Sequence, residues 1–139
     1  MTPDSTTVLE ALAQHLANNG IAQYSPDGIY SGPLPAVVLG YIPEQPDAVI
    51  ALNIANEAVH RAGKHAPDMW IHIRVRTPGV DPRSTERLSQ AIYNLIDTAH
   101  QSWQTVTVRD CHRTVRAPLI QDTNRRYTRA DMYQAHINT

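Results

Sequence analysis

The chain contains 139 residues with a formal net charge of -1, and 42% of them are hydrophobic and 18% charged. This length fits one ordinary domain, so repeat arrays and multidomain enzymes are excluded and we expect a single domain over residues 1–139. Cys111 is the only cysteine, which excludes an internal disulfide and a thiolate-rich zinc site.

The N-terminal third of the chain predicts a helix followed by a loop. We expect the helix over residues 4–19, because Thr7 and Glu10 have capping-box spacing, apolar residues recur on one face, and Gly20 supplies a stop. Residues 21–35 then combine prolines and glycines with two tyrosines, which is typical of an ordered surface loop.

Three strands are expected within residues 36–76. The first two, residues 36–42 and 48–54, are apolar at nearly every position, so we expect both to lie centrally in a sheet covered on two faces. A basic loop at residues 60–65 leads into the third strand, residues 70–76, in which apolar and polar side chains alternate. This alternation indicates one buried face and one solvated face.

The second half predicts a long helix and a group of strands. Asp81 and Pro82 form a helix start, and an apolar stripe follows over residues 82–100, made of Leu88, Ile92, Leu95, Ile96 and Ala99. Strands within residues 105–137 complete the chain, at 105–109, 112–116 and 126–137, with a turn at 122–124. Clustered strands with two helices predict an α+β fold with a mostly antiparallel sheet packed by the two helices.

No catalytic, cofactor or metal site emerges from the residue patterns. Glycine-rich phosphate loops are missing, and the seven histidines are scattered without the spacing of metal ligands on a helix. Neighbouring residues of a strand point to opposite faces, so Cys111 and His112 cannot form a nucleophile–base pair. We therefore expect a protein that is not an enzyme and that needs no cofactor or metal. The sequence also contains no signal peptide, and its longest weakly polar stretch covers about half a membrane span, so we expect a soluble protein with no membrane partner.

Charge is unevenly divided along the chain. Residues 1–60 contain six acidic residues and no Lys or Arg, whereas residues 61–139 contain twelve basic and seven acidic residues. Surfaces of opposite sign would favour head-to-tail association of identical copies, although chance distribution over one surface gives the same pattern. The C-terminal arginines, Arg125, Arg126 and Arg129 among them, suit contacts with a subunit or partner, a solvated face, or nucleic acid.

Several motifs occur in an order that resembles a known family. They are Pro46-Asp47-Ala48-Val49, the alternating strand Ile71 to Arg76, the Asp81-Pro82 helix start, and Asp122, Asn124, Arg125 and Arg126 before the last strand. Together, over Leu9 to Ile137, the chain resembles the bacteriophage tail terminator and minor capsid (head–tail joining) proteins. The family pattern has a glycine where this chain has Arg125.

This resemblance implies a structural α+β subunit without catalytic residues. Such a subunit forms a ring, commonly six-fold, on the head-proximal end of the tail tube, where it ends tube polymerisation and joins the tail to the head connector. The implied partners are other copies of the chain, the major tail tube protein and the head–tail connector or stopper protein, with genome DNA passing through the lumen without sequence-specific binding. The implied location is the virion tail or neck, after assembly in the host cytoplasm.

Two other functions fit the same residues. One is another neck or head-completion component, and the other is a small intracellular α+β binding domain that contacts nucleic acid through its C-terminal arginines. For a ring, the exposed loops and the last strand are the expected contact regions, because they can reach neighbours without disturbing the core. The expected interface residues are Tyr24, Tyr30, Arg61, Lys64, Arg125, Arg126 and Arg129.

Overall fold

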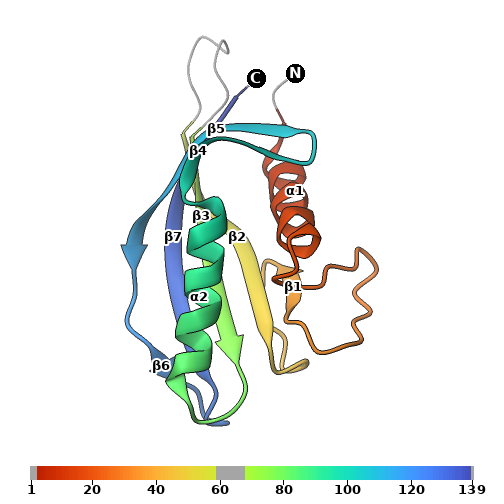
Figure 1. The fold of residues 1–139 in the computed structure, drawn as a ribbon, viewed down its shortest axis with the longest axis vertical. Coiled ribbons are helices and arrows are strands. Elements are labelled where there is room, and N and C mark those ends of the chain that lie inside the picture. Colours follow the sequence, from red (N-terminus) through yellow and green to blue (C-terminus); the bar gives the residue numbers. More distant parts are fainter. Residues whose placement is uncertain (1–2, 59–67, 139) are drawn as a thin grey trace.

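A curled seven-stranded sheet with two helices on its inner face forms the structure (Figure 1). The computed structural model describes residues 3–58 and 68–138. The helices are α1 (Ser5–Asn18) and α2 (Pro82–Ile96). The strands are β1 (Ala36–Leu39), β2 (Val49–Ala58), β3 (Asp68–Thr77), β4 (Thr98–Trp103), β5 (Val106–Arg116), β6 (Ile120–Gln121) and β7 (Tyr127–Ile137).

The sheet confirms the predicted α+β class. Its strand order is β1-β2-β3-β7-β5-β4, with β6 pairing only with β7, and every pair is antiparallel except β1 with β2. The last strand of the chain, β7, lies in the middle, between β3 and β5. The centre of the sheet therefore forms only when strands far apart in the sequence pair with one another.

Helix α1 has the predicted extent but a different N-cap. The Asp4 carboxylate accepts the backbone N–H of Thr7 at 2.8 Å, so Asp4 is the cap and Thr7 lies inside the first turn. Leu12 and Leu16 are fully buried in the core that the helix shares with β2 and β3. Amphipathic spacing therefore predicted the helix correctly, and only the capping residue was misassigned.

Helix α2 begins at Pro82 behind the Asp81 cap, as predicted, but ends at Ile96 rather than at residue 100. Asp97 leaves the helix, and its carboxylate accepts the backbone N–H of Arg113 on β5 at 2.8 Å. The following residues, predicted to be helical, form β4 and pair with β5. A tertiary hydrogen bond from the neighbouring strand thus replaces the last helical turn.

The predicted apolar stripe of α2 is only partly the buried face. Ile92 and Ile96 are buried as predicted, whereas Leu88 and Leu95 are only partly buried and Ala99 is exposed in β4. Towards its N-terminus the helix instead buries Thr85 and Ser89, which form hydrogen bonds with Thr77 at 2.6 Å and Asp131 at 2.7 Å. Polar pairing replaces apolar packing there.

Strand β1 was expected in the centre of the sheet and lies at its edge. It ends at Leu39, because Gly40 turns the chain with φ 96° and donates its N–H to Leu52. Strand β2 is central, as expected, and four successive residues, Val49 to Leu52, are fully buried. Only Ala36 and Val37 of β1 are fully buried, where α1 and β2 contact the strand, while Val38 and Leu39 are partly exposed.

The C-terminal strands are longer and more irregular than the sequence predicted. The two short strands expected at 105–109 and 112–116 form one strand, β5, with register shifts at Val108/Asp110 and Arg113/Val115. Strand β6 was not predicted, while β7 matches the predicted last strand closely. Within the described residues, neither helix is long and apolar enough to cross a membrane.

Candidate assembly surfaces

The loop between α1 and β1 and the chain just after β1 form an aromatic surface. Gln23 orders the loop by donating its side-chain amide to the Leu34 carbonyl at 2.7 Å, and the Tyr30 hydroxyl donates to the Val37 carbonyl. A hollow of about 330 Å³ lies between this loop and residues 41–46. We call this surface the aromatic flank; it comprises Tyr24, Asp27, Ile29, Tyr30, Leu34 and Tyr41.

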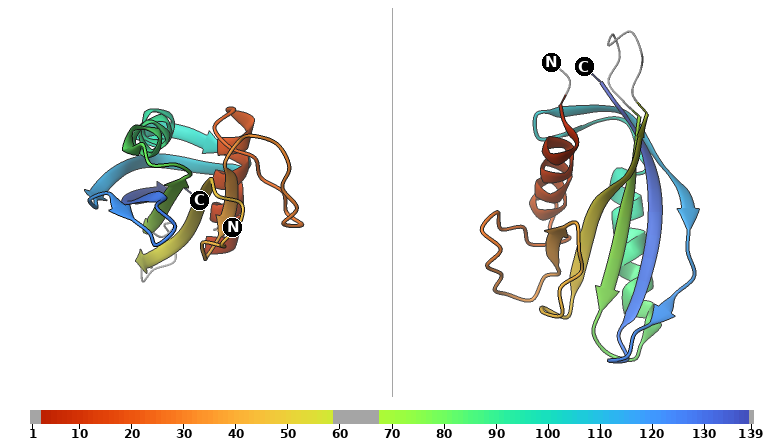
Figure 2. Two further views of the ribbon diagram at one scale, coloured as in Figure 1. Left: turned by 90° about the horizontal axis from the view of Figure 1, so that it is seen from below. Right: turned by 180° about the vertical axis from the view of Figure 1, so that it is seen from behind.

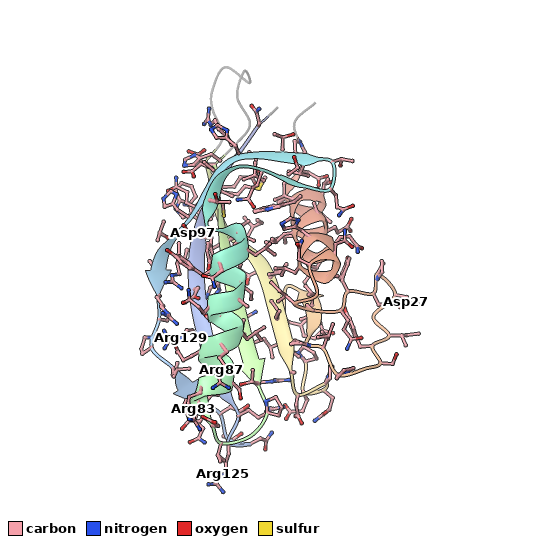
Figure 3. The ribbon with its side chains drawn as sticks, viewed as in Figure 1. Asp27, Arg83, Arg87, Asp97, Arg125 and Arg129 are labelled. Atoms are coloured by element: carbon pink, nitrogen blue, oxygen red, sulfur yellow. The ribbon has the colours of Figure 1, made fainter. Side chains whose placement is uncertain are left out.

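The aromatic flank exposes large apolar side chains beside one acidic group. Ile29 is 75% and Tyr41 69% exposed, and the rings of Tyr24 and Tyr30 line the hollow. Asp27 is the only charged residue between residues 21 and 41, and it lies exposed at the tip of the loop (Figure 3), where its Oδ1 accepts the backbone N–H of Ile29 at 3.1 Å. Exposed apolar area of this kind, beside a concave surface, is typical of a protein interface.

A second surface lies on the other side of the molecule, around the start of α2 and the β6–β7 turn. Figure 3 places Arg83, Arg87 and Arg125 there, away from Asp27. Val80, in the loop before α2, is 60% exposed, whereas Val115 and Ile120 pair with Met132 and Thr128 on the face of the sheet away from α2. We call this surface the arginine flank; it comprises Val80, Arg83, Arg87 and Arg125.

Arg126, one of the predicted interface arginines, is bound within the chain. Its side chain is only 7% exposed, and its Nε donates to Asp122 Oδ2 at 2.8 Å. Its two Nη atoms donate to the Glu44 carbonyl at 2.9 Å, Asp47 Oδ1 at 3.1 Å and Glu44 Oε1 at 3.1 Å. Arg126 therefore joins the β6–β7 turn to residues 44–47, which lie before β2.

Arg76 holds the same segment from β3. Its side chain donates to the backbone carbonyls of Pro43, Pro46 and Asp47 at 2.8, 2.8 and 2.9 Å. The residue is 4% exposed, and desolvation lowers the pKa of its guanidinium. Basic residues of the second half of the chain thus bind the acidic segment of the first half, and part of the charge asymmetry is satisfied inside the molecule.

Arg129 is also paired internally, in an ionic layer between α2 and strands β5 and β7. Its Nη2 lies 2.5 Å from Glu86 Oε1, and Arg116 Nη2 lies 2.6 Å from Glu86 Oε2. Asp131, which is buried, accepts the Ser89 hydroxyl and lies 3.7 Å from Arg113 Nη1. These arginines fasten the helix to the sheet.

Arg125 is the exposed member of the predicted C-terminal trio. It lies in the turn before β7 with φ 65°, in the left-handed region that favours glycine. Asp122 shapes the turn by accepting the backbone N–H groups of Asn124 and Arg126 at 2.9 and 2.8 Å. The turn therefore adopts the conformation expected for the glycine of the family pattern, with an arginine in its place.

The remaining predicted interface residues, Arg61 and Lys64, lie outside the described residues. Their contact with a neighbouring subunit stays a prediction. Sequence reasoning identified the arginines of the C-terminal segment as a group, but it did not distinguish the buried Arg126 from the exposed Arg125. The sequence did not single out Arg83, Arg87 and Tyr41, whose exposure becomes visible only when the neighbouring elements are placed.

The structure keeps Cys111 and His112 on opposite faces of β5, as predicted. Cys111 is fully buried on the helix side, and burial raises the pKa of its thiol. His112 lies on the other face, beside Asp110 and His136. Cys111 is therefore a core residue, and it forms no nucleophile–base pair with any described residue.

Comparison with known proteins gives one family match. The model of the family described as "Bacteriophage tail terminator protein" matches residues 15–139. Among solved structures, a chain from an assembly described as "Virion of native gene transfer agent (GTA) particle" is similar over 95% of both chains, with a TM-score of 0.61 and 14% identity. At this identity the likeness concerns the fold. No curated protein sequence gives a significant match.

Proposed function

The chain belongs to the bacteriophage tail terminator family and is a structural component of a phage-type tail, and from this premise we propose that it caps the head-proximal end of the tail tube as a ring. In this proposal the ring ends tube polymerisation and then receives the head connector. The observation that carries the proposal is the family match over residues 15–139. This range includes α2, all seven strands and the β6–β7 turn.

A closed ring of identical subunits requires two different surfaces that complement one another. The aromatic flank and the arginine flank meet this requirement, because they lie on different sides of the molecule and each exposes at least one apolar side chain. The aromatic flank also has a hollow into which an apolar side chain of a neighbour can insert. We therefore propose that the aromatic flank of one subunit contacts the arginine flank of the next.

Charge supports the same pairing. Asp27 is the single charge near the tip of the aromatic flank, and the arginine flank presents Arg87 and Arg125. Rim charges of this kind act mainly on association rate and orientation, and salt screens them. The ring should therefore assemble faster at low ionic strength than at high ionic strength.

The internal pairing of the other arginines argues against nucleic-acid binding as the main role. Arg116, Arg126 and Arg129 all form ion pairs with carboxylates of their own chain. They would have to give up these partners to contact phosphates. This fits a lumen through which genome DNA passes without specific contacts, with the tail tube protein and the head connector as the principal partners.

Light scattering coupled to size-exclusion chromatography tests ring formation, and a matched pair of variants tests the interface. We expect a mass several times that of the monomer, and six times for a hexamer. Arg125→Glu should slow assembly several-fold, whereas Arg109→Glu, an equal charge change on β5 outside both flanks, should not. Tyr41→Ser should weaken the oligomer without changing thermal stability. A protein that stays monomeric at high concentration, alone and with tail tubes, would contradict the proposal.

A further inference from the structure

A cluster of titratable side chains occupies the face of the sheet opposite α2. Figure 2 (right) shows this face, with β3 and β7 in front of the helix. The strand register places Asp68 of β3 beside His136 of β7, and His136 beside Asp110 of β5. His112 follows two residues after Asp110 and lies on the same face. Residues far apart in the sequence thus meet at one end of three adjacent strands.

The register shift in β5 creates this arrangement. Val108 and Cys111 are both fully buried on the helix side, although they are three positions apart and a regular strand would point them to opposite faces. The irregularity between Val108 and Asp110 makes this possible, and it turns Asp110 and His112 to the opposite face. Local bulges often re-aim side chains next to functional sites.

The geometry of three of these residues suits a metal ion. One potential ligand atom each from Asp110, His112 and His136 lies within 4.8 Å of the other two. Ligands bound to Zn²⁺ at about 2.0–2.2 Å in a tetrahedral site lie roughly 3.4 Å apart, so small side-chain rotations would close the site. The two imidazole rings are already stacked, with centroids 5.9 Å apart.

Asp68 supplies the orienting contact that metal-binding histidines usually have. Its Oδ1 lies 2.6 Å from His136 Nδ1, and both side chains are about four-fifths buried. When Nδ1–H donates to this carboxylate, the lone pair of Nε2 is free for a metal. The carboxylate also fixes the ring, so His136 is held in place before any ion arrives.

We propose that Asp110, His112 and His136 bind one divalent transition-metal ion, with Asp68 as the positioning residue. Two imidazoles and one carboxylate suit ions such as Zn²⁺ or Co²⁺ better than Mg²⁺ or Ca²⁺, which prefer oxygen ligands. Three protein ligands leave one coordination position for water or for a group from a neighbouring molecule. The bound ion joins β5 to β7 across the register shift. Binding of the ion does not depend on formation of the ring.

The test uses the full-length protein without a histidine tag, after removal of metals with a chelator. Titration with Zn²⁺ by calorimetry should give one ion per chain, and Co²⁺ should give visible absorption bands without a thiolate charge-transfer band, because Cys111 lies on the other face. His136→Gln and His112→Gln should each weaken binding at least ten-fold. Asp68→Asn should weaken it by about 10–100-fold, the range for orienting partners. His100→Asn, which changes an exposed histidine of β4, is the matched control and should bind as the unaltered protein does.

A second measurement covers the case in which a variant fails to fold. In the unaltered protein, Zn²⁺ should shift the NMR signals of the His112 and His136 imidazoles and leave those of His100 unchanged. The proposal is wrong if the unaltered protein binds no Zn²⁺ or Co²⁺. It is equally wrong if folded His112→Gln and His136→Gln proteins bind the ion unchanged, or if the ion shifts other histidines only.

Discussion

Replacing Arg126 with methionine should destabilise the protein although the residue lies in a surface turn. Methionine keeps most of the apolar stem and removes the guanidinium. That group makes four hydrogen bonds of 2.8 to 3.1 Å to three residues, Asp122, Glu44 and Asp47. The substitution therefore disconnects the β6–β7 turn from residues 44–47 without opening a large cavity.

The size of the effect depends on how exposed each partner is. Glu44 and Asp47 have side chains 72% and 47% exposed, so their ion pairs contribute about 0–1 kcal/mol each. Asp122 is 28% exposed, and its bond and the bond to the Glu44 carbonyl involve a charged donor, which suggests about 1–2 kcal/mol each after solvation is allowed for. Together these contributions give a loss of about 2–6 kcal/mol in the free energy of unfolding, or roughly 6–20 °C in the thermal midpoint.

Thermal and urea unfolding followed by circular dichroism measure this loss. Arg125→Met is the matched control, because the neighbouring arginine is exposed and its side chain forms no ion pair within the described part of the chain. It should unfold within about 0.5 kcal/mol of the unaltered protein. Equal stability of the Arg126→Met and Arg125→Met proteins would refute the role assigned to Arg126.

Three further predictions concern the core, the turn and pH. Ile96→Ala should cost about 2–5 kcal/mol in urea unfolding and Leu95→Ala clearly less, because only Ile96 is fully buried; equal costs would contradict the burial of α2. Arg125→Gly should raise the free energy of unfolding by about 0.5–1 kcal/mol, because glycine adopts the positive φ without strain; a lower free energy of unfolding measured by calorimetry would contradict this. Burial lowers the pKa of His15, so the folded state resists its protonation, and the stability this residue contributes is present above pH 6.5 and lost as pH falls below it. The thermal midpoint should therefore drop more steeply between pH 7.5 and 5.5 in the unaltered protein than in the His15→Gln protein. Parallel curves of thermal midpoint against pH would contradict this role of His15.

The local sequence pattern correctly predicted the elements that have one face on the core and the other face in solvent. The spacing of Leu12 and Leu16 identified α1, and the alternation around Ile71 identified β3, because in both cases one face meets the core and the other meets solvent. The turn residue Asp122 was also recognised from its neighbours. These features depend on contacts within a few residues, which the sequence displays directly.

The errors arise where distant segments decide the structure. The end of α2 depends on a hydrogen bond from Arg113 to Asp97, sixteen residues earlier in the chain. The burial of Arg126 depends on acceptors about 80 residues away, at Glu44 and Asp47. Strict alternation along β5 does not anticipate the register shift that brings Asp110 and His112 next to His136. Such pairings are set by sheet topology, which a single sequence does not display.

Electron microscopy of tail tubes growing in the presence of this protein tests the central proposal most directly. Purified tube protein of the same particle would be polymerised alone and with increasing amounts of the chain, and tube lengths and ends would be recorded. The account predicts that growth stops as the chain is added, with a ring of density at one end of each tube. Tubes that reach the same lengths with and without the chain, with both ends bare, would contradict it.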